Sequence, residues 1–399
     1  MTTDIERQVE IVKRGTVAVT TDVELRRKLA KGVPLKIKLG VDPTAPDIHL
    51  GHTVVLRKLR QFQDLGHQAI LIIGDFTALI GDPTGRMKTR PPLEVAEIER
   101  NAATYLDQVG KVLDMKRLSI RRNSEWLKPL TFTEVMNLAA KLTVARLIER
   151  DDFSQRFKNN IEIGLHEFMY PLMQAYDSVV VEADVEIGGN DQLVNLLMGR
   201  RLQRATGQEE QVALTLPLLV GTDGVQKMSK SYGNHIGVSE SAVEMYSKAM
   251  SVPDGVMKDY FTLLTGVAMA EVDGLLAVHP MTAKKRLARE IVLGFHNEES
   301  ADDAARQWDA VMSRKEAPEE MPDISVDGAE LKEGKVWIVR LVALTGITKS
   351  NGEARRLIAQ GGVEINAEKV TDPDAMVAIA AGDLLKIGKK RRYFRISLG

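Results

Sequence analysis

The chain has 399 residues, a length that corresponds to two or three domains. Hydrophobic residues make up 44% and charged residues 27% of the sequence, which excludes a largely disordered protein. The 54 Lys and Arg residues nearly balance the 55 Asp and Glu residues, so a uniformly basic nucleic-acid-binding surface is excluded, although a basic patch on one domain is not.

The amino-acid types and segments that the sequence lacks limit the chemistry and the location that can be expected of the protein. There is no cysteine, which excludes disulfides, thiolate nucleophiles and cysteine-ligated zinc or iron–sulfur sites. The first ten residues carry acidic side chains and no apolar core, unlike a secretory signal, and no apolar run approaches the roughly 20 residues of a membrane span. We therefore expect a cytoplasmic protein that does not associate with membranes.

Strand-like and helix-like patterns alternate between residue 34 and about residue 220. The predicted strands are 35–41, 69–74, 118–121, 178–181 and 211–219, and the longest predicted helices are 93–113 and 191–205. Strands separated by helices predict βαβ units, and hence an α/β fold with a mainly parallel sheet.

The first predicted strand has one apolar and one polar face. Its apolar residues alternate with Lys36, Lys38, Gly40 and Asp42, whereas a strand covered on both faces of a parallel sheet is nearly all apolar. The pattern by itself is compatible with a solvent-exposed edge strand or with a polar site on one face of the sheet.

Two histidines at the start of a predicted helix suggest an anion-binding site. His49 and His52, in the sequence HLGH, share one helix face and lie where free backbone N–H groups attract anions, while Gly51 permits close approach to the backbone. We predict a phosphate site here. A capped helix with surface histidines is the alternative, and a two-histidine metal site is disfavoured because no acidic third ligand stands nearby at helical spacing.

A second basic motif, KMSKS, lies between glycines. Lys227 and Lys230 stand three residues apart with Met228 and Ser229 between them, so a mobile loop there could close over a polyphosphate. As an isolated charge cluster it is more often a solvated loop. HLGH and KMSKS in this order, about one domain apart, together indicate a nucleotide site.

The C-terminal third is divided by composition. We expect a catalytic domain over 1–232, an α-helical domain over 233–317, an acidic linker punctuated by proline and glycine over 318–335, and a separate module over 336–399. That module holds 11 Lys and Arg against 6 Asp and Glu, a net charge of +5 in a chain whose net charge is −1.

The basic residues of the module suggest RNA binding. A predicted helix at 350–360 and a strand at 363–365 argue against a solubilising tail, and a protein-docking module is the other alternative. Positive charge beside aromatic side chains suits RNA, because phosphate contacts give affinity and aromatic rings stack on bases. The candidate RNA-binding residues are Lys349, Arg355, Arg356, Lys389, Lys390, Arg391 and Arg392.

At this point the sequence resembles the class I aminoacyl-tRNA synthetases, and within them the bacterial tyrosyl-tRNA synthetases. The resemblance is carried by HLGH, KMSKS, GVDPT at 40–44, IGDPTG at 80–85, YPLMQAYD at 170–177 and GGNDQ at 188–192, and by an S4-type RNA-binding pattern at the C-terminus. It implies a Rossmann-like parallel-sheet catalytic domain, an α-helical domain and a small α+β S4-like domain.

The resemblance also implies a reaction. L-Tyrosine and ATP would give tyrosyl-adenylate and pyrophosphate, and the tyrosyl group would pass to the 3′-terminal ribose of tRNA(Tyr). Mg²⁺ would accompany ATP without a dedicated protein metal site. A homodimer formed through the helical insert around 131–152 is implied, although an amphipathic helix there is equally compatible with the core of a monomer.

Residue roles follow from the same motifs. Asp82, Tyr170 and Gln174 would hold the substrate ammonium, Asp177 would accept the phenolic hydroxyl, and Gln192 would lie against the carbonyl. The tyrosine-binding set is Lys38, Gly40, Asp42, Asp82, Tyr170, Gln174, Asp177 and Gln192. The ATP-binding set is Thr44, His49, Gly51, His52, Arg86, Arg90, Asp191, Lys227, Met228, Ser229 and Lys230, of which Thr44, His49, His52, Lys227 and Lys230 are expected to be catalytic.

Two points of the resemblance stay open. Lys38 stands where many bacterial members have a tyrosine; we hypothesise that it pairs with a carboxylate such as Asp177 or donates to the phenol. Arg86 and Arg90 are equally typical of a solvated basic loop. The competing functions are a tryptophan enzyme, which the 170–177 motif and the S4-like module disfavour, and a non-catalytic RNA-binding protein, which the intact HLGH and KMSKS disfavour.

Overall fold

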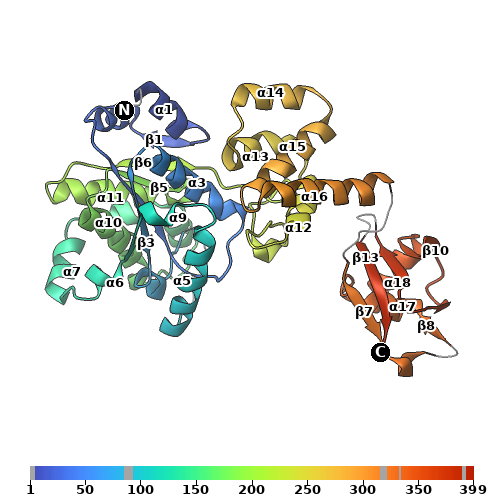
Figure 1. The fold of residues 1–399 in the computed structure, drawn as a ribbon. Helices are drawn as coiled ribbons and strands as arrows, with labels where there is room; N and C mark the ends of the chain where they lie inside the picture. The colour runs from blue at the N-terminus through green and yellow to red at the C-terminus, as the bar shows by residue number, and fades with distance from the viewer. Residues whose placement is uncertain (1–4, 85–92, 315–320, 332–333, 389–391) are drawn as a thin grey trace. The chain divides into compact units, whose positions relative to one another are not determined.

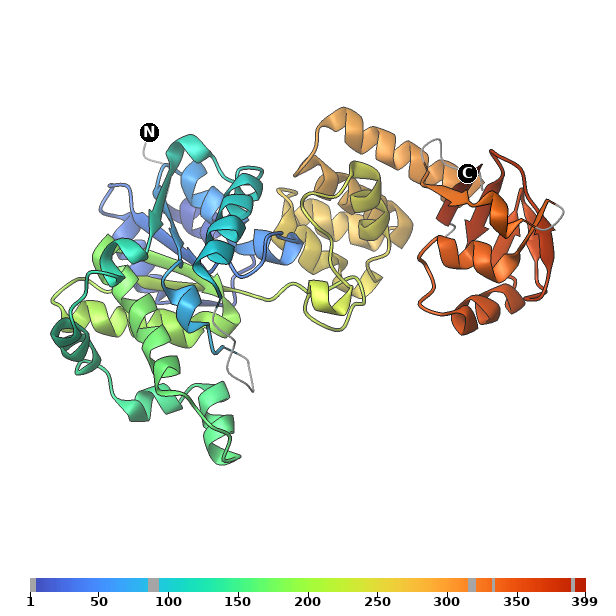
Figure 2. The same cartoon turned by 90° about the horizontal axis from the view of Figure 1, so that it is seen from below.

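The computed structural model describes residues 5–84, 93–314, 321–331, 334–388 and 392–399 (Figures 1 and 2). These residues form two compact units, Met1–Glu298 and Glu299–Gly399, which are taken separately below. Among the described residues, no helix is both long and apolar enough to cross a membrane.

The first unit is built on a six-stranded sheet in the order β1-β6-β5-β2-β3-β4. Neighbouring strands are parallel except for β1, which pairs antiparallel with β6 at one edge. This confirms the predicted α/β class and parallel-rich sheet. The strands are β1 (Ala18–Thr20), β2 (Lys36–Val41), β3 (Gln68–Ile73), β4 (Leu118–Arg122), β5 (Val185–Gly189) and β6 (Val212–Leu216).

Helices cover both faces of this sheet. Helices α10 and α11 pack on each other over one face, and α3 lies on the other (Figure 1). The α-helices of the unit up to β6 are α1 (Ile5–Lys13), α2 (Asp22–Leu29), α3 (Leu50–Asp64), α4 (Thr77–Ile80), α5 (Val95–Val109), α6 (Ser124–Leu127), α7 (Phe132–Ala139), α8 (Val144–Ile148), α9 (Asp151–Lys158), α10 (Met169–Val181) and α11 (Leu193–Ala205).

The strand order reverses between β2 and β5. From β2 the chain adds β3 and β4 on one side, and the later strands β5 and β6 are added on the other. In open α/β sheets a crevice forms outside the carboxyl ends of the strands at such a reversal, and ligands bind there. The topology therefore places a candidate site at the ends of β2 and β5.

One predicted strand is helical, and one of the two alternatives left open for another strand is excluded. The segment 178–181 is the last turn of α10, and the strand is β5, which begins at Val185. Its valines resemble a strand locally, but the helix pattern that carries Tyr170 and Asp177 continues through them, and Val181 packs in the core. The first predicted strand is not an edge strand either, since β2 is central in the sheet and Lys38 is fully buried.

The region 239–315 is predicted to be helical, and its described part, up to residue 314, is mostly helical. It contains α12 (Ala242–Met250), α13 (Met257–Leu264), α14 (Met269–Ala277), α15 (Pro280–Leu293) and α16 (Glu298–Asp309). Helix α13 packs on α3, and α12 to α15 belong to the same compact unit as the sheet. The structure thus divides the chain near Glu298, inside the predicted helical domain of 233–317.

The second unit has a five-stranded sheet in the order β10-β9-β12-β13-β7 and a two-stranded sheet of β11 and β8. Helices α17 (Ile338–Leu344) and α18 (Asn351–Ala359) share an apolar core with these strands (Figure 2). The strands are β7 (Asp323–Val326), β8 (Lys335–Trp337), β9 (Val363–Ile365), β10 (Glu368–Val370), β11 (Met376–Ala378), β12 (Leu384–Ile387) and β13 (Arg392–Leu398).

The segment 318–335 was predicted to be a linker, but it contains strand β7, which belongs to the second unit. This strand pairs in parallel with β13 and buries Ile324 and Val326 in the core of the second unit. The two apolar residues alternate with polar ones, a strand signal hidden within an acidic segment rich in proline and glycine.

Candidate active site

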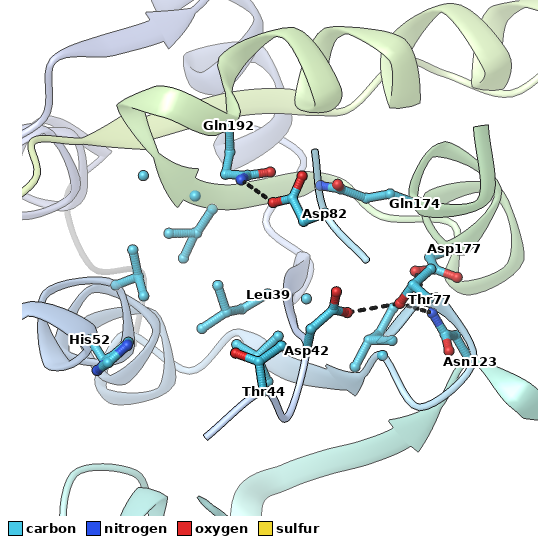
Figure 3. A pocket seen from close by; sticks show the side chains of 18 of the residues that line it. Leu39, Asp42, Thr44, His52, Thr77, Asp82, Asn123, Gln174, Asp177 and Gln192 are labelled. Carbon is cyan, nitrogen blue, oxygen red and sulfur yellow. Dashed lines mark hydrogen bonds between the residues drawn. The ribbon is translucent and has the colours of Figure 1, made fainter. Parts of the chain in front are cut away.

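A cavity of about 360 Å³ lies at the carboxyl ends of β2 and β5, where the strand order reverses (Figure 3). Nine of the predicted site residues line it: Gly40, Asp42, Thr44, His52, Asp82, Tyr170, Gln174, Asp177 and Gln192. The two aspartates expected to hold opposite ends of the amino acid, Asp82 and Asp177, therefore face one cavity. Lining residues that the sequence did not reveal include Asp47, Thr77, Tyr105, Asn123 and Glu186.

Helix α10 supplies one wall of the cavity. Tyr170, Gln174 and Asp177 are spaced so that all three lie on one helix face, and all three line the cavity. Pro171 falls in the first turn of α10, where a backbone N–H would have no partner within the helix, so it starts the helix without breaking it.

Asp177 is a buried carboxylate held by neutral donors. The indole Nε1 of Trp126 donates to its Oδ1 at 2.8 Å, and the Nδ2 of Asn123 donates to its Oδ2 at 3.4 Å. Burial raises the pKa of Asp177 to about 7, and the nearby Lys38 charge opposes that rise. Neither Trp126 nor Asn123 belongs to a motif, so only the fold could reveal them.

Asp42 forms a second, partly buried acceptor at the end of β2. It accepts hydrogen bonds from the Oγ1 of Thr77 at 2.8 Å and from the phenolic oxygen of Tyr170 at 3.0 Å. Desolvation raises its pKa to about 7, the Thr77 hydrogen bond opposes that rise, and the charges of Asp82 and Asp177 add to it.

Asp82 is held in place by its own loop. Its Oδ1 accepts from the backbone N (2.9 Å) and the Oγ1 (2.6 Å) of Thr84, and its Oδ2 accepts from Nε2 of Gln192 at 2.9 Å (Figure 3). Gly40 lies across the cavity, where an added Cβ would meet no atom within 4 Å. A side chain there would project into the cavity, so glycine leaves room for a ligand.

Lys38 pairs with a carboxylate, as hypothesised, but the carboxylate is that of Glu186 and not that of Asp177. Its Nζ contacts Oε1 of Glu186 at 2.8 Å, Oγ of Ser178 at 2.7 Å and the backbone carbonyl of Gln174 at 2.9 Å. These three acceptors use all three ammonium protons, so neither a hydrogen bond to Asp177 nor one to a phenol is left for Lys38. A glutamate inside the otherwise apolar strand β5 was the available signal for this pairing.

The loop that leads to HLGH is held by α5. The side-chain amide of Gln108 accepts from the backbone N of Ile48 at 2.9 Å and donates to the carbonyl of Pro46 at 2.8 Å. Asn101 donates to the carbonyl of Pro43 at 3.1 Å. These contacts fix the segment between β2 and α3, where proline prevents regular backbone hydrogen bonding.

The HLGH histidines form the N-terminus of α3. His49 is its N-cap residue and accepts from the N–H of Gly51 at 3.1 Å, while Nδ1 of His52 accepts from the N–H of His49 at 3.2 Å. The ring centroids are 3.9 Å apart. Desolvation, and then the neighbouring positive groups, lower the pKa of His49 to about 3 and that of His52 to about 4. Both rings are therefore neutral at pH 7.

The KMSKS segment lies against the start of α3. Met228 is buried, its backbone N donates to the carbonyl of Leu219 at 2.7 Å, and its Cβ would be 3.6 Å from a Cβ added at Gly51. The backbone N of Ser229 donates to Oδ1 of Asn234 at 2.8 Å, and Nζ of Lys230 forms an ion pair with Oδ2 of Asp47 at 2.6 Å. HLGH and KMSKS, the two motifs that indicate a nucleotide site, therefore lie against each other.

The remaining predicted residues have different placements. Asp191 follows β5 and is close enough to Asp82 and Lys227 to feel both charges. In the second unit Lys349, Arg355, Arg356 and Arg392 are exposed, and Arg355 pairs with Asp374 and lies 5.5 Å from the Trp337 ring. Five predicted residues lie outside the described part of the chain: Arg86, Arg90, Lys389, Lys390 and Arg391.

The same described part of the chain was also expected to lack a dedicated metal site. It contains no group of three or more His, Asp or Glu side chains that could hold a metal ion. The polar groups of the cavity are instead suited to hydrogen bonds with ammonium, hydroxyl and phosphate groups.

Comparisons with known proteins agree with this geometry. The family model of class I tRNA synthetases (W and Y) matches residues 30–313, and that of the tyrosine–tRNA ligase SYY-like C-terminal domain matches residues 315–394. Curated tyrosine–tRNA ligases from Moorella thermoacetica and Aquifex aeolicus are 53% and 52% identical, over 97% and 98% of this chain and 95% and 99% of theirs.

Solved structures share the fold. A tyrosyl-tRNA synthetase complexed with L-tyrosine from Archaeoglobus fulgidus is similar with a TM-score of 0.62 at 24% identity, over 76% of this chain and 100% of that one. A C-terminally truncated mitochondrial tyrosyl-tRNA synthetase from Aspergillus nidulans gives 0.64 at 24%, over 75% and 92%. The chain thus belongs to the class I tRNA synthetases of the tryptophan and tyrosine group and, within them, to the tyrosine–tRNA ligases.

Proposed function

We propose that the cavity activates L-tyrosine with ATP and that the chain then transfers the tyrosyl group to the 3′-terminal ribose of tRNA(Tyr). One observation carries the proposal. A single cavity has the buried carboxylate of Asp177 at one part of its wall and His52 of HLGH at another, so a hydroxylated amino acid and a nucleotide can meet inside it.

The tyrosine end supplies acceptors that match the substrate. Asp177 would accept the phenolic hydroxyl, and Asp82 and Gln174 would accept the ammonium group. Asp42 would act through Tyr170, whose hydroxyl it already binds. A substrate without the hydroxyl would leave the Asp177 carboxylate without that partner in a desolvated site, which costs about 1–3 kcal/mol or more. Phenylalanine is rejected for this reason.

The phosphate end supplies donors for the chemical step. An oxygen of the tyrosine carboxylate attacks the α-phosphorus of ATP, the bond to the bridging oxygen breaks, and pyrophosphate leaves with the electron pair. No general base is needed, because the nucleophile is already an anion. The N–H groups at the start of α3 and the neutral imidazoles of His49 and His52 would bind the phosphoryl oxygens, and Asp191 would bind the ribose.

The lysines of KMSKS would supply mobile positive charge. Lys227 and Lys230 would neutralise the charge that develops on the departing pyrophosphate, an interaction that speeds the reaction because it strengthens in the transition state. Lys230 must exchange its partner Asp47 for a phosphate to do so. Mg²⁺ enters as part of the Mg·ATP substrate, held by phosphates and water.

The second unit would bind the tRNA. Its exposed Lys349, Arg356 and Arg392 suit contacts with RNA phosphates. This assignment divides the labour between the two compact units, with adenylate formation in residues 1–298. We also propose that the enzyme works in the cytoplasm.

We propose a homodimer from exposed apolar side chains on the helical insert (Phe132 and Val144) and on the segment that follows it (Phe157 and Leu165). The exposed fractions of these side chains are 80% for Phe132, 81% for Leu165, 63% for Phe157 and 60% for Val144. Exposed apolar surface of this extent often marks a protein–protein interface. We expect wild type to sediment as a dimer and Phe132→Glu to shift it towards monomer. A monomeric wild type would refute this part of the proposal.

The activity is tested by ATP–pyrophosphate exchange. Label should enter ATP only when tyrosine is present, and not with tryptophan or without an amino acid. Exchange with tryptophan would indicate the other enzyme of the group, and exchange with neither would indicate a non-catalytic RNA-binding protein.

Transfer is tested by truncation. A chain ending at residue 314 removes the whole second sheet, including β7, whereas a cut after residue 335 would leave β7 without its partner. We expect unchanged exchange and tRNA charging lowered roughly a thousandfold, the usual gap between specific and non-specific binding. A full-length chain that carries Lys349→Ala and Arg356→Ala serves as the matched variant. Its tRNA charging should fall less than that of the truncated chain, and its difference from wild type should shrink at high salt. Intact charging by the truncated chain would refute the RNA role.

A further inference from the structure

A buried ion pair lies directly behind the amino-acid end of the cavity. Lys38 on β2 and Glu186 on β5 are register partners across the two central strands, and both are at most 1% exposed. Their Nζ and Oε1 atoms are 2.8 Å apart. A pair of this kind is seldom retained for stability, because desolvation offsets its attraction. Its other contacts indicate what it does.

The carboxylate of Glu186 has a full set of donors. Its Oε1 accepts from Lys38 and from Nε2 of Gln174 at 3.2 Å. Its Oε2 accepts from Oγ of Ser178 at 3.1 Å and from Nε2 of Gln211. Because the three protons of Lys38 are also used, the ion pair itself is satisfied without any ligand, and the side-chain oxygens of Gln174 and Gln211 are the buried acceptors that this network leaves without a partner among the described residues.

Gln174 connects this network to the cavity. A carboxylate can only accept hydrogen bonds, so the NH₂ group of Gln174 must face Glu186 and its carbonyl oxygen must face away. That oxygen, Oε1, is buried and has no hydrogen-bond partner within the described chain. Gln174 lines the cavity beside Asp82 (Figure 3). A buried acceptor without a partner is costly, and a ligand that donates a proton removes that cost.

We infer that the Lys38–Glu186 pair is a positioning device for the substrate ammonium group. By holding the NH₂ of Gln174, it presents the Gln174 carbonyl oxygen to the cavity, where a donor such as the α-ammonium of tyrosine completes it. Glu186 lines the cavity, but both of its carboxylate oxygens already accept hydrogen bonds, so the pair acts through Gln174 and not by binding the substrate itself. Without Glu186 the Gln174 amide could turn its NH₂ group towards the ammonium and repel it. The inference rests on the proposed function of the cavity.

The test is a thermodynamic cycle of tyrosine binding, measured by calorimetry. Lys38→Met/Glu186→Leu replaces the pair with apolar side chains of similar size and leaves no unpaired buried charge. Gln174→Met removes the acceptor itself. We expect each to weaken tyrosine binding about tenfold, the worth of one hydrogen bond, and the triple variant to be no weaker than either one.

A conservative variant separates positioning from general stability. In Glu186→Gln, Lys38 still requires an acceptor, so the introduced carbonyl oxygen faces Lys38 and Gln174, and we expect tyrosine affinity within about twofold of wild type. If Lys38→Met/Glu186→Leu does not fold, Lys38→Met/Glu186→Gln takes its place in the cycle, because without Lys38 the introduced amide no longer orients Gln174.

Several results would overturn the inference. They are full affinity in the pair variant, effects that add in the triple variant, or a loss in Glu186→Gln as large as in the pair variant. Failure of the wild type to bind tyrosine would instead refute the proposed function of the cavity.

Discussion

The two ends of the cavity solve different problems. At the amino-acid end, Asp177 is buried and Asp42 partly buried, and fixed neutral donors hold both before any ligand arrives. At the phosphate end, the groups are neutral imidazoles and Lys230, which forms an ion pair with Asp47, a residue whose own side chain is 57% exposed.

The difference teaches how one site combines selection with reaction. Selecting a hydroxyl requires an acceptor whose unmet hydrogen bond is costly, and burial provides that cost. Speeding phosphoryl transfer requires charge that engages more strongly in the transition state than in the ground state, and a mobile lysine provides it. Three changes probe this contrast.

The largest expected effect is at the phosphate end. Lys230→Ala should lower the rate constant of adenylate formation about 100- to 1000-fold, the usual effect of removing one transition-state donor. Tyrosine affinity should change less than about twofold. Lys258→Ala is the matched control, since it removes a lysine–aspartate pair elsewhere in the unit, with a 2.7 Å contact to Asp273. Rapid-quench kinetics gives the rate and calorimetry the affinity; equal losses in both would contradict the contrast.

The next effect is at the amino-acid end. Asp177→Asn should weaken tyrosine binding about 10- to 100-fold, because it removes a charged acceptor for the phenolic hydroxyl. The rate constant at saturating tyrosine should fall much less. Phenylalanine affinity is the internal control and should hold or rise. A variant that lost both amino acids equally would show that Asp177 supports the fold instead of selecting the substrate.

The smallest effect concerns stability and pH. Burial raises the pKa of Asp177 from its ordinary 3.8 to about 7, so the folded chain keeps a proton that the unfolded chain releases. The stability contributed by this group is complete below pH 3.8 and is lost as pH rises to 7.

An asparagine does not titrate, so Asp177→Asn should gain stability relative to wild type as pH rises. The gain between pH 6 and pH 8 should be about 1 kcal/mol in the free energy of unfolding. Urea unfolding at several pH values measures it, and comparing variant with wild type cancels the titrating groups that do not sense Asp177. Asp42 does sense it, and because loss of the Asp177 charge lowers the pKa of Asp42, its change has the same sign as the expected gain. A difference that does not change with pH would mean that Asp177 is already ionised in the fold.

Much of this site could be predicted from the sequence because its residues fall in short motifs. The spacing of Tyr170, Gln174 and Asp177 predicts one helix face, and HLGH predicts a helix N-terminus whatever surrounds it. The Lys38 partner could not be assigned, because β2 and β5 are about 150 residues apart and their register depends on the whole sheet.

The remaining errors have related causes. The valines before Glu182 favour a strand locally, and only packing against the core keeps them in α10. Strand β7 is four residues long, and its partner strand β13 lies some 70 residues further along the chain. Trp126 and Asn123 reach Asp177 from a short turn that no local pattern marks as part of a site.

The uncharged state of the two HLGH histidines has a consequence for turnover. Pyrophosphate is a highly charged product, and a pair of imidazolium groups at the start of α3 would hold it after the chemical step. With pKa values of about 3 and 4, these rings donate hydrogen bonds without adding net positive charge. We therefore expect the product to depart when the lysine loop withdraws, and the release step to vary little between pH 6 and pH 8.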